Sequence, residues 1–418
     1  MLTKVAFWYD RPQEYTGGLN YMRNLLFALS TLEDKKIKPY IFFGKRVDAD
    51  VVRPFEVLAT VVRSSILDRK SPAWFLHKIL FRFFGSLLMV NIAIRRHGIS
   101  IVSHAEHVYG RNRPFRIISW IPDFQYLHLP ELFPGLDTKA ETRKMRKIAA
   151  QSDALILSSY AALEDYRSIA GPAKSGGVTV LQFVSQPGGA LHDAVNPPTM
   201  AEIEVKYRFR GPFFFLPNQF WQHKNHAAVF AAVKMLKEQR VEVLLLCTGN
   251  LRDYRMRDTP YVDGLLQFIE DNDLSRNIKI LGAIDYADVL FLMRNSVAVI
   301  NPSRFEGWSS TVEEAKSMGK RLILSNIPVH REQNPSLALY FEPDDDHGLA
   351  QAMATLWTNS TDAIGEIDEQ QAAKHLRQRT VAYAEGYSRL VLTLERRMRG
   401  ATDCESLPPI PPNHHQRR

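Results

Sequence analysis

Short runs of apolar residues alternate along the chain with longer segments in which apolar residues recur at helical spacing. Residues 19–29 are of the helical kind, with leucine or methionine three or four positions apart. The short runs predict buried strands at residues 5–9, 39–43, 57–62, 99–102, 117–121, 154–157, 178–183, 213–216, 241–247, 278–281, 297–300 and 322–324. Further helices are predicted at residues 139–150, 225–236, 261–272, 287–294 and 311–319, and mainly helical structure follows residue 341.

A Pro- and Gly-rich stretch, SQPGGALHDAVNPP, divides this alternation into two halves. Strands alternating with helices on both sides predict an α/β protein with two doubly wound, Rossmann-like domains that face a cleft. The expected divisions are an N-terminal domain at 1–184, a linker at 185–199, a C-terminal domain at 200–362, helices at 363–400 that are candidates to pack back on the N-terminal domain, and a disordered tail at 401–418.

The 418-residue chain has a formal net charge of +8 and a sequence pI of about 9.3. This charge suggests an acidic partner: nucleic acid, an anionic membrane surface or a phosphorylated small molecule. Only two cysteines occur, Cys247 and Cys404, and no His or Cys cluster has metal-ligand spacing. The first residues, MLTKVAFWYDRPQ, lack the features of a signal peptide. We therefore expect a reducing, cytoplasmic setting.

Residues 63–97 are basic and aromatic, and Asp68 is their single acid. Their longest uncharged run, residues 83–94, has 12 residues, whereas a membrane span needs roughly 20. The segment fits either helices that lie on an anionic membrane surface or ordinary core aromatics beside a solvated charged face. We expect no nucleic-acid partner, because the charge is not accompanied by a helix-turn-helix, zinc-finger or RNA-binding signature.

Two glutamates flank a predicted strand-to-helix junction. Glu306 lies in the loop after the strand at 297–300, and Glu314 lies in the first turn of the next helix. Ser310 and Glu313 fit a capping box, so Glu313 is interpreted as a helix cap. The alternative is that all these acids cap and solvate a surface helix. It suits Glu306 least, because that loop position has no capping role and lies where α/β proteins bind ligands.

A second loop follows the strand at 213–216 and contains Asn218, Gln219, Trp221 and Lys224. Lys224 stands just before a helix, whose first N–H groups attract anions. A diphosphate held between this helix and the one near Ser310 would gain charge-assisted hydrogen bonds without a metal ion. The alternative is an ordinary exposed loop lysine.

The predicted N-terminal domain offers further candidates. Gly17 and Gly18 open the helix at 19–29, either as an anion-binding turn or as a plain tight turn. Polar residues that follow two strands are candidates to line a cleft, although a lone histidine is more often structural: His104, His107, Asp123 and His128.

These segments together resemble glycosyltransferase family 4 (glycosyl transferases group 1), retaining enzymes of GT-B architecture. Glu306 and Glu314, with seven residues between them in FEGWSSTVEEAKSMGK, look like the E-x7-E signature. LPNQFWQHKNH resembles the phosphate-binding loop, the Gly17-Gly18 pair the glycine loop, and ISWIPDFQYLHLPELFP the segment that contributes to the acceptor and sugar site. The resemblance covers nearly the whole chain, and the order of the four motifs makes it specific.

The resemblance implies roles for the matching residues. Glu314 would bind the ribose hydroxyls of the nucleotide, Glu306 the hydroxyls of the donor sugar, and Lys224 the diphosphate. Backbone N–H groups around Ser309, Ser310 and Thr311 would add phosphate contacts, while Gly17 and Gly18 would lie close to the donor phosphate and the acceptor. Asn218 and Trp221 are substrate-binding candidates in the lysine loop.

Two positions depart from the family pattern. Gln219 stands where an arginine often precedes the lysine by five residues, so one phosphate-binding charge is missing or supplied elsewhere. Pro122-Asp123 stands where many members have His-Asp. His128 or His104 is then the nearest substitute for the histidine that contacts the sugar, and the catalytic candidates are Lys224, Glu306 and His128.

The family implies a retaining, metal-independent hexosyltransferase. It would move a hexose-type sugar from a nucleotide-sugar donor to a hydroxyl of a glycan or lipid-linked acceptor, in bacterial-type cell-surface polysaccharide synthesis, in the cytoplasm or on the inner face of the plasma membrane. The leaving phosphate would take the acceptor proton, whereas a glycosidase would need two facing carboxylates. The alternatives are a nucleotide-sugar epimerase of the same architecture and a non-catalytic basic adaptor that binds a membrane or nucleic acid. A Rossmann dehydrogenase is excluded because no G-x-G-x-x-G follows the first strand.

Overall fold

A computed structural model describes residues 2–8, 16–84, 86–105, 113–170, 177–187, 198–251, 260–358 and 369–398. The contacts between residues divide the chain into two compact units. Unit 1 comprises residues 1–124, 136–184 and 378–418, and unit 2 comprises residues 125–135 and 185–377. Most of the predicted linker, the whole predicted tail and His107 lie outside the described residues.

Unit 1 is built on a parallel sheet that has seven strands in the described part of the chain, in the order β3-β2-β1-β4-β5-β6-β7. The strands are β1 (Thr3–Trp8), β2 (Ile37–Phe43), β3 (Thr60–Arg63), β4 (Ile101–Ala105), β5 (Arg116–Ile121), β6 (Ala154–Leu157) and β7 (Val178–Val180). The helices are α1 (Thr16–Ser30), α2 (Ala49–Glu56), α3 (Pro72–Phe84), α4 (Leu88–Arg96), α6 (Thr138–Gln151), α7 (Tyr160–Ala170) and the later part of α16 (Glu369–Met398), with a 3-10 turn η1 (Ser65–Leu67).

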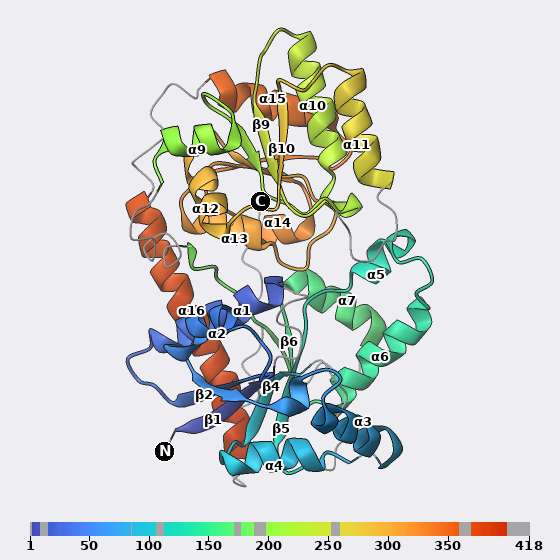
Figure 1. Ribbon diagram of the computed structural model, residues 1–418, viewed down its shortest axis with the longest axis vertical. Coiled ribbons are helices and arrows are strands. Elements are labelled where there is room, and N and C mark those ends of the chain that lie inside the picture. The colour runs from blue at the N-terminus through green and yellow to red at the C-terminus, as the bar shows by residue number, and fades with distance from the viewer. Residues whose placement is uncertain are drawn as a thin grey trace, which may run out of the picture. The chain divides into compact units, whose positions relative to one another are not determined.

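Alternate residues of the strands of unit 1 face opposite layers of helices. Ala6 and Phe42 pack with Val90 and Ile94 of α4 on one face. Phe7 stacks on Tyr387 of α16, with ring centroids 6.0 Å apart. The later part of α16, which comes from the far end of the chain, is thus part of the core of unit 1 (Figure 1).

Unit 2 is built on a second parallel sheet, with six strands among the described residues in the order β10-β9-β8-β11-β12-β13. The strands are β8 (Phe214–Leu216), β9 (Leu245–Thr248), β10 (Ile278–Gly282), β11 (Val299–Asn301), β12 (Leu322–Ser325) and β13 (Ala338–Phe341). The helices are α5 (Gln125–His128), α9 (Met200–Tyr207), α10 (His226–Glu238), α11 (Pro260–Asp271), α12 (Tyr286–Asn295), α13 (Ser310–Ser317), α14 (Pro328–Gln333) and α15 (Asp346–Thr358), with 3-10 turns η2 (Pro130–Leu132) and η4 (Gln222–Lys224).

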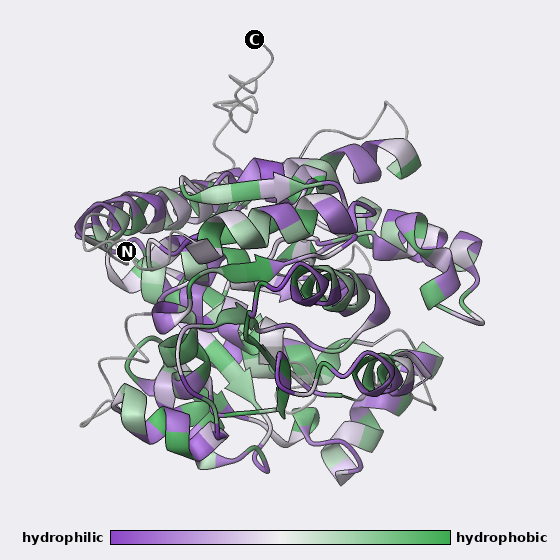
Figure 2. Ribbon diagram, turned by 90° about the horizontal axis from the view of Figure 1, so that it is seen from above, coloured by the Kyte–Doolittle hydropathy of each residue, from purple (hydrophilic) through white to green (hydrophobic). Residues whose placement is uncertain are grey.

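The two faces of this second sheet carry separate cores. Phe214 and Leu216 pack with α10, α11 and α15. Phe215, the residue between them, packs with α9, α12 and α13. Figure 2 shows the consequence, with largely apolar strands and helices whose residues alternate between hydrophilic and hydrophobic. The predicted fold class of two doubly wound α/β domains is confirmed.

Some predicted boundaries were wrong. The strand expected at 241–247 begins only at Leu245, because the N–H of Val241 binds the carbonyl of Leu236, 2.9 Å away, and closes the end of α10. Strand β13 was not predicted at all. Its residues belong to the apolar run LALYF at 337–341, which the rule for short apolar runs would have found, and they lie on the edge of the sheet, where β12 is their partner.

No helix in the described ranges is long and apolar enough to cross a membrane.

Candidate functional site

The candidate site of unit 2 lies where the strand order reverses. Strands β8 and β11 are neighbours in the sheet, yet the chain winds from β8 to β9 on one side and from β11 to β12 on the other. Ligands of open α/β sheets bind at the carboxyl ends of the strands that flank such a point. The loop with Lys224 follows β8, and the loop with Glu306 follows β11. The two predicted loops are therefore adjacent.

A network of buried side chains ties the two loops together. The Nδ2 of Asn218 donates to the Oδ1 of Asn301 at 3.2 Å, and the Nδ2 of Asn301 donates to the Oγ of Ser309 at 2.8 Å. The hydroxyl of Thr311 donates to the Oδ1 of Asn218 at 3.2 Å. The ends of β8 and β11 and the beginning of α13 thus hold one another in position. Buried polar groups that are satisfied in this way fix a loop conformation.

Lys224 and Glu306 form an ion pair in which the Nζ lies 2.6 Å from the Oε1. The side chain of Lys224 is 14% exposed and that of Glu306 is 9% exposed. Neither residue is a solvated surface group, so the alternative of an ordinary loop lysine is wrong.

The electrostatics of the pair also involve His330 of α14. Burial by itself would raise the pKa of Glu306, but the charge of Lys224, assisted by His330 and by a hydrogen bond from Ser303, lowers it to about 2. Burial lowers the pKa of His330 to about 4. At neutral pH Glu306 is therefore a carboxylate and His330 a neutral imidazole.

The tautomer of His330 follows from its neighbours. The Nδ1 lies 3.0 Å from the carbonyl oxygen of Ser325, which can only accept, so Nδ1 carries the proton. The Nε2 is then a bare acceptor. It is buried and makes no hydrogen bond to any described residue. An acceptor of this kind, close enough to Glu306 for the charges to interact, can receive a hydroxyl group of a ligand.

Glu314 has different surroundings from Glu306. It is buried on α13, and the hydroxyl of Tyr286 donates to its Oε1 at 2.7 Å. Burial raises the pKa of Glu314 to about 7, with the Tyr286 hydrogen bond opposing the rise. A carboxyl group held in this state can bind the hydroxyls of a ligand as donor or as acceptor.

Helix α13 begins one residue earlier than the capping box predicted. Ser309, not Ser310, is the N-cap, and its Oγ accepts the N–H of Val312 at 3.4 Å. The carbonyl of Ser309 also receives the Nε2 of Gln333 at 2.9 Å, which holds it in place. Glu313 is buried beside Gln333 and Lys316 instead of capping the helix in solvent. The interpretation of Glu313 as a cap was wrong because tertiary contacts select Ser309.

Gln219 does not supply a cation, and its side chain is tied elsewhere. Its Oε1 accepts the N–H of Asn250 at 2.7 Å, which links the loop after β8 to the loop after β9. Gly249 allows this close approach. A Cβ at Gly249 would lie 2.3 Å from the carbonyl oxygen of Asn218, and its φ of +145° suits glycine alone. Trp221 stands in the same loop, its ring 5.7 Å from that of His223.

His128 belongs to unit 2, although it precedes the rest of that unit by more than 50 residues in the chain. It ends the short helix α5, and its ring lies 5.0 Å from that of Phe305, the residue before Glu306. The structure therefore brings His128 to the Glu306 loop, as its candidacy as a catalytic residue requires.

The other predicted residues belong to unit 1. Gly17 and Gly18 lie in the first turn of α1, as predicted. Asp123 is half-buried after β5. His104, at the end of β4, has both ring nitrogens engaged, by Tyr21 and by Ser103 at 2.9 Å each, and burial lowers its pKa to about 3. A ligand would have to displace one of these partners to reach His104.

The sequence interpretation missed Tyr286, His330 and Gln333. His330 follows β12 much as Lys224 and Glu306 follow their own strands, so the same rule would have found it. Tyr286 follows β10 in the same way, and Gln333 lies three residues after His330 on α14, so this rule points to the segments that contain both of them.

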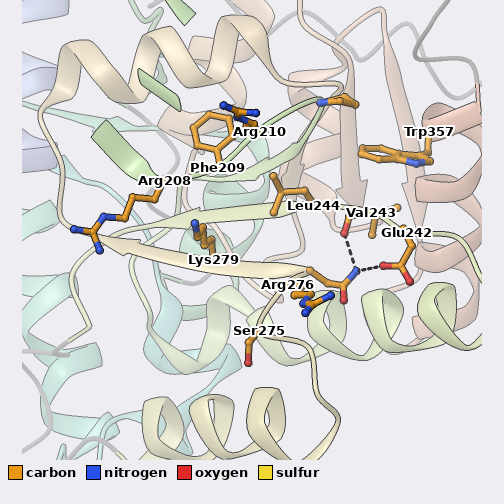
Figure 3. Close-up of a pocket in the computed structure, with 12 residues that line it drawn as sticks. Arg208, Phe209, Arg210, Glu242, Val243, Leu244, Ser275, Arg276, Lys279 and Trp357 are labelled. Atoms are coloured by element: carbon orange, nitrogen blue, oxygen red, sulfur yellow. Dashed lines mark hydrogen bonds between the residues drawn. The ribbon is translucent and has the colours of Figure 1, made fainter. Parts of the chain in front are cut away.

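A cavity of about 460 Å³ lies at the amino ends of the strands of this sheet, opposite to their carboxyl ends (Figure 3). Its lining segments precede β8, β9 and β10 or begin them, so it faces away from Lys224 and Glu306. It is basic, with Arg208, Arg210, Arg276 and Lys279 around Glu242, which accepts a hydrogen bond from Asn277 at 2.9 Å. This cavity is therefore separate from the candidate site.

The part of unit 2 that contains Lys224 and Glu306 matches a known protein family. Residues 202–377 match the family model described as "Glycosyl transferases group 1", and all of these residues lie in unit 2. The O-antigen chain mannosyltransferase RfbU of Salmonella typhimurium is 25% identical over 166 residues, which are 40% of this chain and 43% of the relative. The chain thus spans less than half the length of this curated relative.

Solved structures of similar fold cover nearly the whole chain. A glycosyltransferase from Rickettsia africae has a TM-score of 0.64 at 14% identity, over 95% of this chain and 97% of its own. Sucrose-phosphate synthase from Thermosynechococcus elongatus has a TM-score of 0.64 at 15% identity, over 95% and 98%. The lipopolysaccharide outer core galactosyltransferase WaaB has a TM-score of 0.60 at 14% identity, over 94% and 100%. At this level of identity the likeness shows the fold, which is the GT-B type.

Proposed function

We propose that the protein is a retaining glycosyltransferase that moves a hexose-type sugar from a nucleotide-sugar donor to a hydroxyl of a glycan or lipid-linked acceptor. The observation that carries the proposal is the buried ion pair of Lys224 and Glu306 at the reversal of strand order, within the segment that matches the family model. A cation for a diphosphate and a carboxylate for sugar hydroxyls occur there side by side.

The donor is proposed to bind along the carboxyl edge of the sheet. The diphosphate would attract the Nζ of Lys224 and the N–H groups of Ser310 and Thr311, which lie in the first turn of α13. Glu314 would hold the ribose hydroxyls, and Glu306, with the Nε2 of His330, the hydroxyls of the sugar. The sugar would thereby be fixed relative to its leaving phosphate.

The transfer step breaks the bond between the anomeric carbon and the phosphate oxygen and forms a bond from that carbon to the acceptor oxygen. The acceptor proton passes to the leaving phosphate on the same face, which retains the configuration. Lys224 and the α13 amino terminus would stabilise the charge that develops on the diphosphate. This requires no nucleophile from the protein, and we propose that it requires no metal ion.

The acceptor side is proposed to use His128, beside Phe305, together with Gly17, Gly18, Asp123 and His104 of unit 1. A role in cell-surface polysaccharide synthesis is supported by one relative, which is named as an O-antigen chain mannosyltransferase.

A thermal-shift screen of the full chain against a panel of sugar nucleotides tests donor binding. We expect one or a few donors to raise the melting temperature, and Glu306→Gln to abolish that shift. Transfer to the acceptor is measured by release of the nucleoside diphosphate. It should be lost in the Lys224→Met variant. In the wild-type protein it should continue when a metal chelator is present. Release of nucleotide without any acceptor would favour an epimerase, and no response to any sugar nucleotide would refute the proposal.

A further inference from the structure

Helix α3 of unit 1 is apolar in sequence but has no buried residue. Of its large apolar side chains, Phe83 is 76% exposed, Phe84 is 75% exposed and Phe75 is 51% exposed. Single exposed apolar residues are normal on a protein surface, whereas a gathered group marks an interaction site.

The exposed residues of α3 form a stripe. At about 100° per residue, Phe75, Leu76, Ile79 and Phe83 fall within about 100° of the helix circumference. Phe81, on the other side of the helix, packs against the core of unit 1. The helix therefore turns one face inward and presents a continuous apolar face to solvent.

Helix α4 also has exposed apolar residues. Val90 and Ile94 are buried against the sheet, while Leu88 is 54% exposed and Ile92 is 57% exposed. The two helices contact each other. Leu88 and Ile92 are four residues apart and lie on one side of α4, so this helix also has an exposed apolar side.

Cations border this apolar surface. Lys78 and Arg82 stand along one flank of the α3 stripe, and Arg95 and Arg96 end α4 in exposed positions. No acid occurs between residues 69 and 100. The nearest one, Asp68, is buried and accepts the backbone N–H groups of Lys45 and Arg46 at 3.1 and 3.0 Å. The acid is therefore turned inward, and the surface is left positive.

Arg63 is not part of this surface. Its Nη1 donates to the carbonyls of Gly44 and Val47 at 2.9 and 2.8 Å. The cations of residues 63–97 thus divide into one internal structural group and the exposed ones that border the apolar face.

We propose that α3 and α4 dock the protein on an anionic lipid bilayer. A bilayer presents a negative headgroup layer directly above hydrocarbon, which matches an apolar stripe bordered by lysine and arginine without acids. Each of the two helices has an exposed apolar side. The proposal stands on these two helices alone and does not depend on the transferase reaction.

The test is co-sedimentation of the full chain, without donor or acceptor, with phosphatidylcholine vesicles and with vesicles containing one quarter phosphatidylglycerol. We expect binding to the anionic vesicles alone. The triple variant Lys78→Gln/Arg82→Gln/Arg96→Gln should bind about 100-fold more weakly, at about fivefold for each cation removed. Phe75→Ser/Ile79→Ser/Phe83→Ser should weaken binding by at least about tenfold.

A charge-matched control comes from the basic cavity of unit 2. Arg208→Gln/Arg210→Gln/Arg276→Gln removes the same number of exposed cations and should leave vesicle binding within twofold of the wild type. Equal loss in this control would show non-specific attraction and would overturn the proposal. So would absence of wild-type binding to anionic vesicles. An apolar variant that dissociates a dimer but keeps its lipid binding would assign the surface to a second copy of the chain. Because the changed side chains are exposed, each variant should keep the wild-type melting temperature.

Discussion

The Nζ of Lys224 lies 2.6 Å from the Oε1 of Glu306, although the two residues are 82 positions apart in the chain. Each side chain enters from the loop after one of two adjacent parallel strands, β8 and β11. Both side chains are largely buried. A charge removed from one partner therefore leaves the other without compensation in a poorly solvated place.

Replacement of one partner of this pair should destabilise the protein. We expect Lys224→Ala to cost about 3–5 kcal/mol of the free energy of unfolding, because Glu306 would remain buried and charged. The neutral double variant Lys224→Met/Glu306→Gln should lose much less, since it leaves no uncompensated charge. Urea denaturation measures both.

The matched control is Lys234, whose Nζ lies 3.9 Å from Glu238 on the exposed face of α10. Lys234→Ala should cost less than about 1 kcal/mol, as exposed pairs do. If Lys224→Ala cost no more than Lys234→Ala, the buried pair would not have the energetic role described above.

The decrease in the free energy of unfolding at acidic pH should depend on Glu306. Its pKa falls from 4.5 to about 2 on folding, so the unfolded chain binds more protons between these values. The stabilisation from this group is complete above pH 4.5 and is lost as the pH falls towards 2. Against the wild type, the double variant should show a flatter loss of stability over this interval in denaturation curves recorded at several pH values. Parallel curves would contradict the depressed pKa.

Glu314 should have the opposite pH dependence. Its pKa rises from 4.5 to about 7 on folding, so the folded state binds more protons between these values and stability falls as the pH rises through them. Glu314→Gln imitates the protonated form. It should therefore stabilise the ligand-free protein at pH 8 by up to about 3 kcal/mol and have little effect at pH 4.

Glu314→Gln should also weaken donor binding. At this residue, a change that stabilises the ligand-free protein is therefore expected to reduce function. Tyr286→Phe is the useful companion, because it removes a hydrogen bond that lowers the pKa of Glu314. Measured in a Tyr286→Phe background, the stabilisation by Glu314→Gln should therefore still begin near pH 4.5, but it should become larger and reach its full value at a higher pH. A stabilisation that is equal at both pH values would show that Glu314 does not titrate in this range.

Much of this site could be predicted from the sequence, because the rule that places it is local. An apolar run that ends in a polar loop marks the carboxyl end of a parallel strand, and Asn218, Lys224 and Glu306 all follow such runs. The pairing of Lys224 with Glu306 required one further step, namely that both strands belong to one sheet, and the strand order confirms it.

Burial and the choice of partners could not be predicted in this way. Glu306 and Glu314 look alike in sequence, yet one has a depressed pKa and the other a raised one, because Lys224 reaches only the first. His104 follows a strand as the functional candidates do, but Tyr21 and Ser103 engage both its nitrogens. Such differences arise from side chains that approach from distant parts of the chain.

Gly249 should be intolerant of any side chain. A Cβ there would meet the backbone of Asn218 and Gln219, and the φ of +145° adds strain. We expect Gly249→Ala to destabilise the protein by more than about 2 kcal/mol and to weaken donor binding, since the loop that leads to Lys224 must shift. Gly282→Ala is the control. It has a positive φ of +71° but an open Cβ position, so it should show the strain alone, and donor binding should be unchanged. Equal effects of both changes in denaturation and thermal-shift measurements would rule out the close approach as the cause.

The free acceptor on His330 should serve the sugar and not the nucleotide. His330→Asn keeps a donor near the position of Nδ1, which binds the carbonyl of Ser325, but removes Nε2. We expect it to weaken binding of the sugar nucleotide about tenfold, the effect of one hydrogen bond of about 1.4 kcal/mol. Binding of the corresponding nucleoside diphosphate should not change. Titration calorimetry with both ligands distinguishes the outcomes: equal weakening of both would place His330 near the phosphates, and no change in either would mean that its Nε2 does not face the donor.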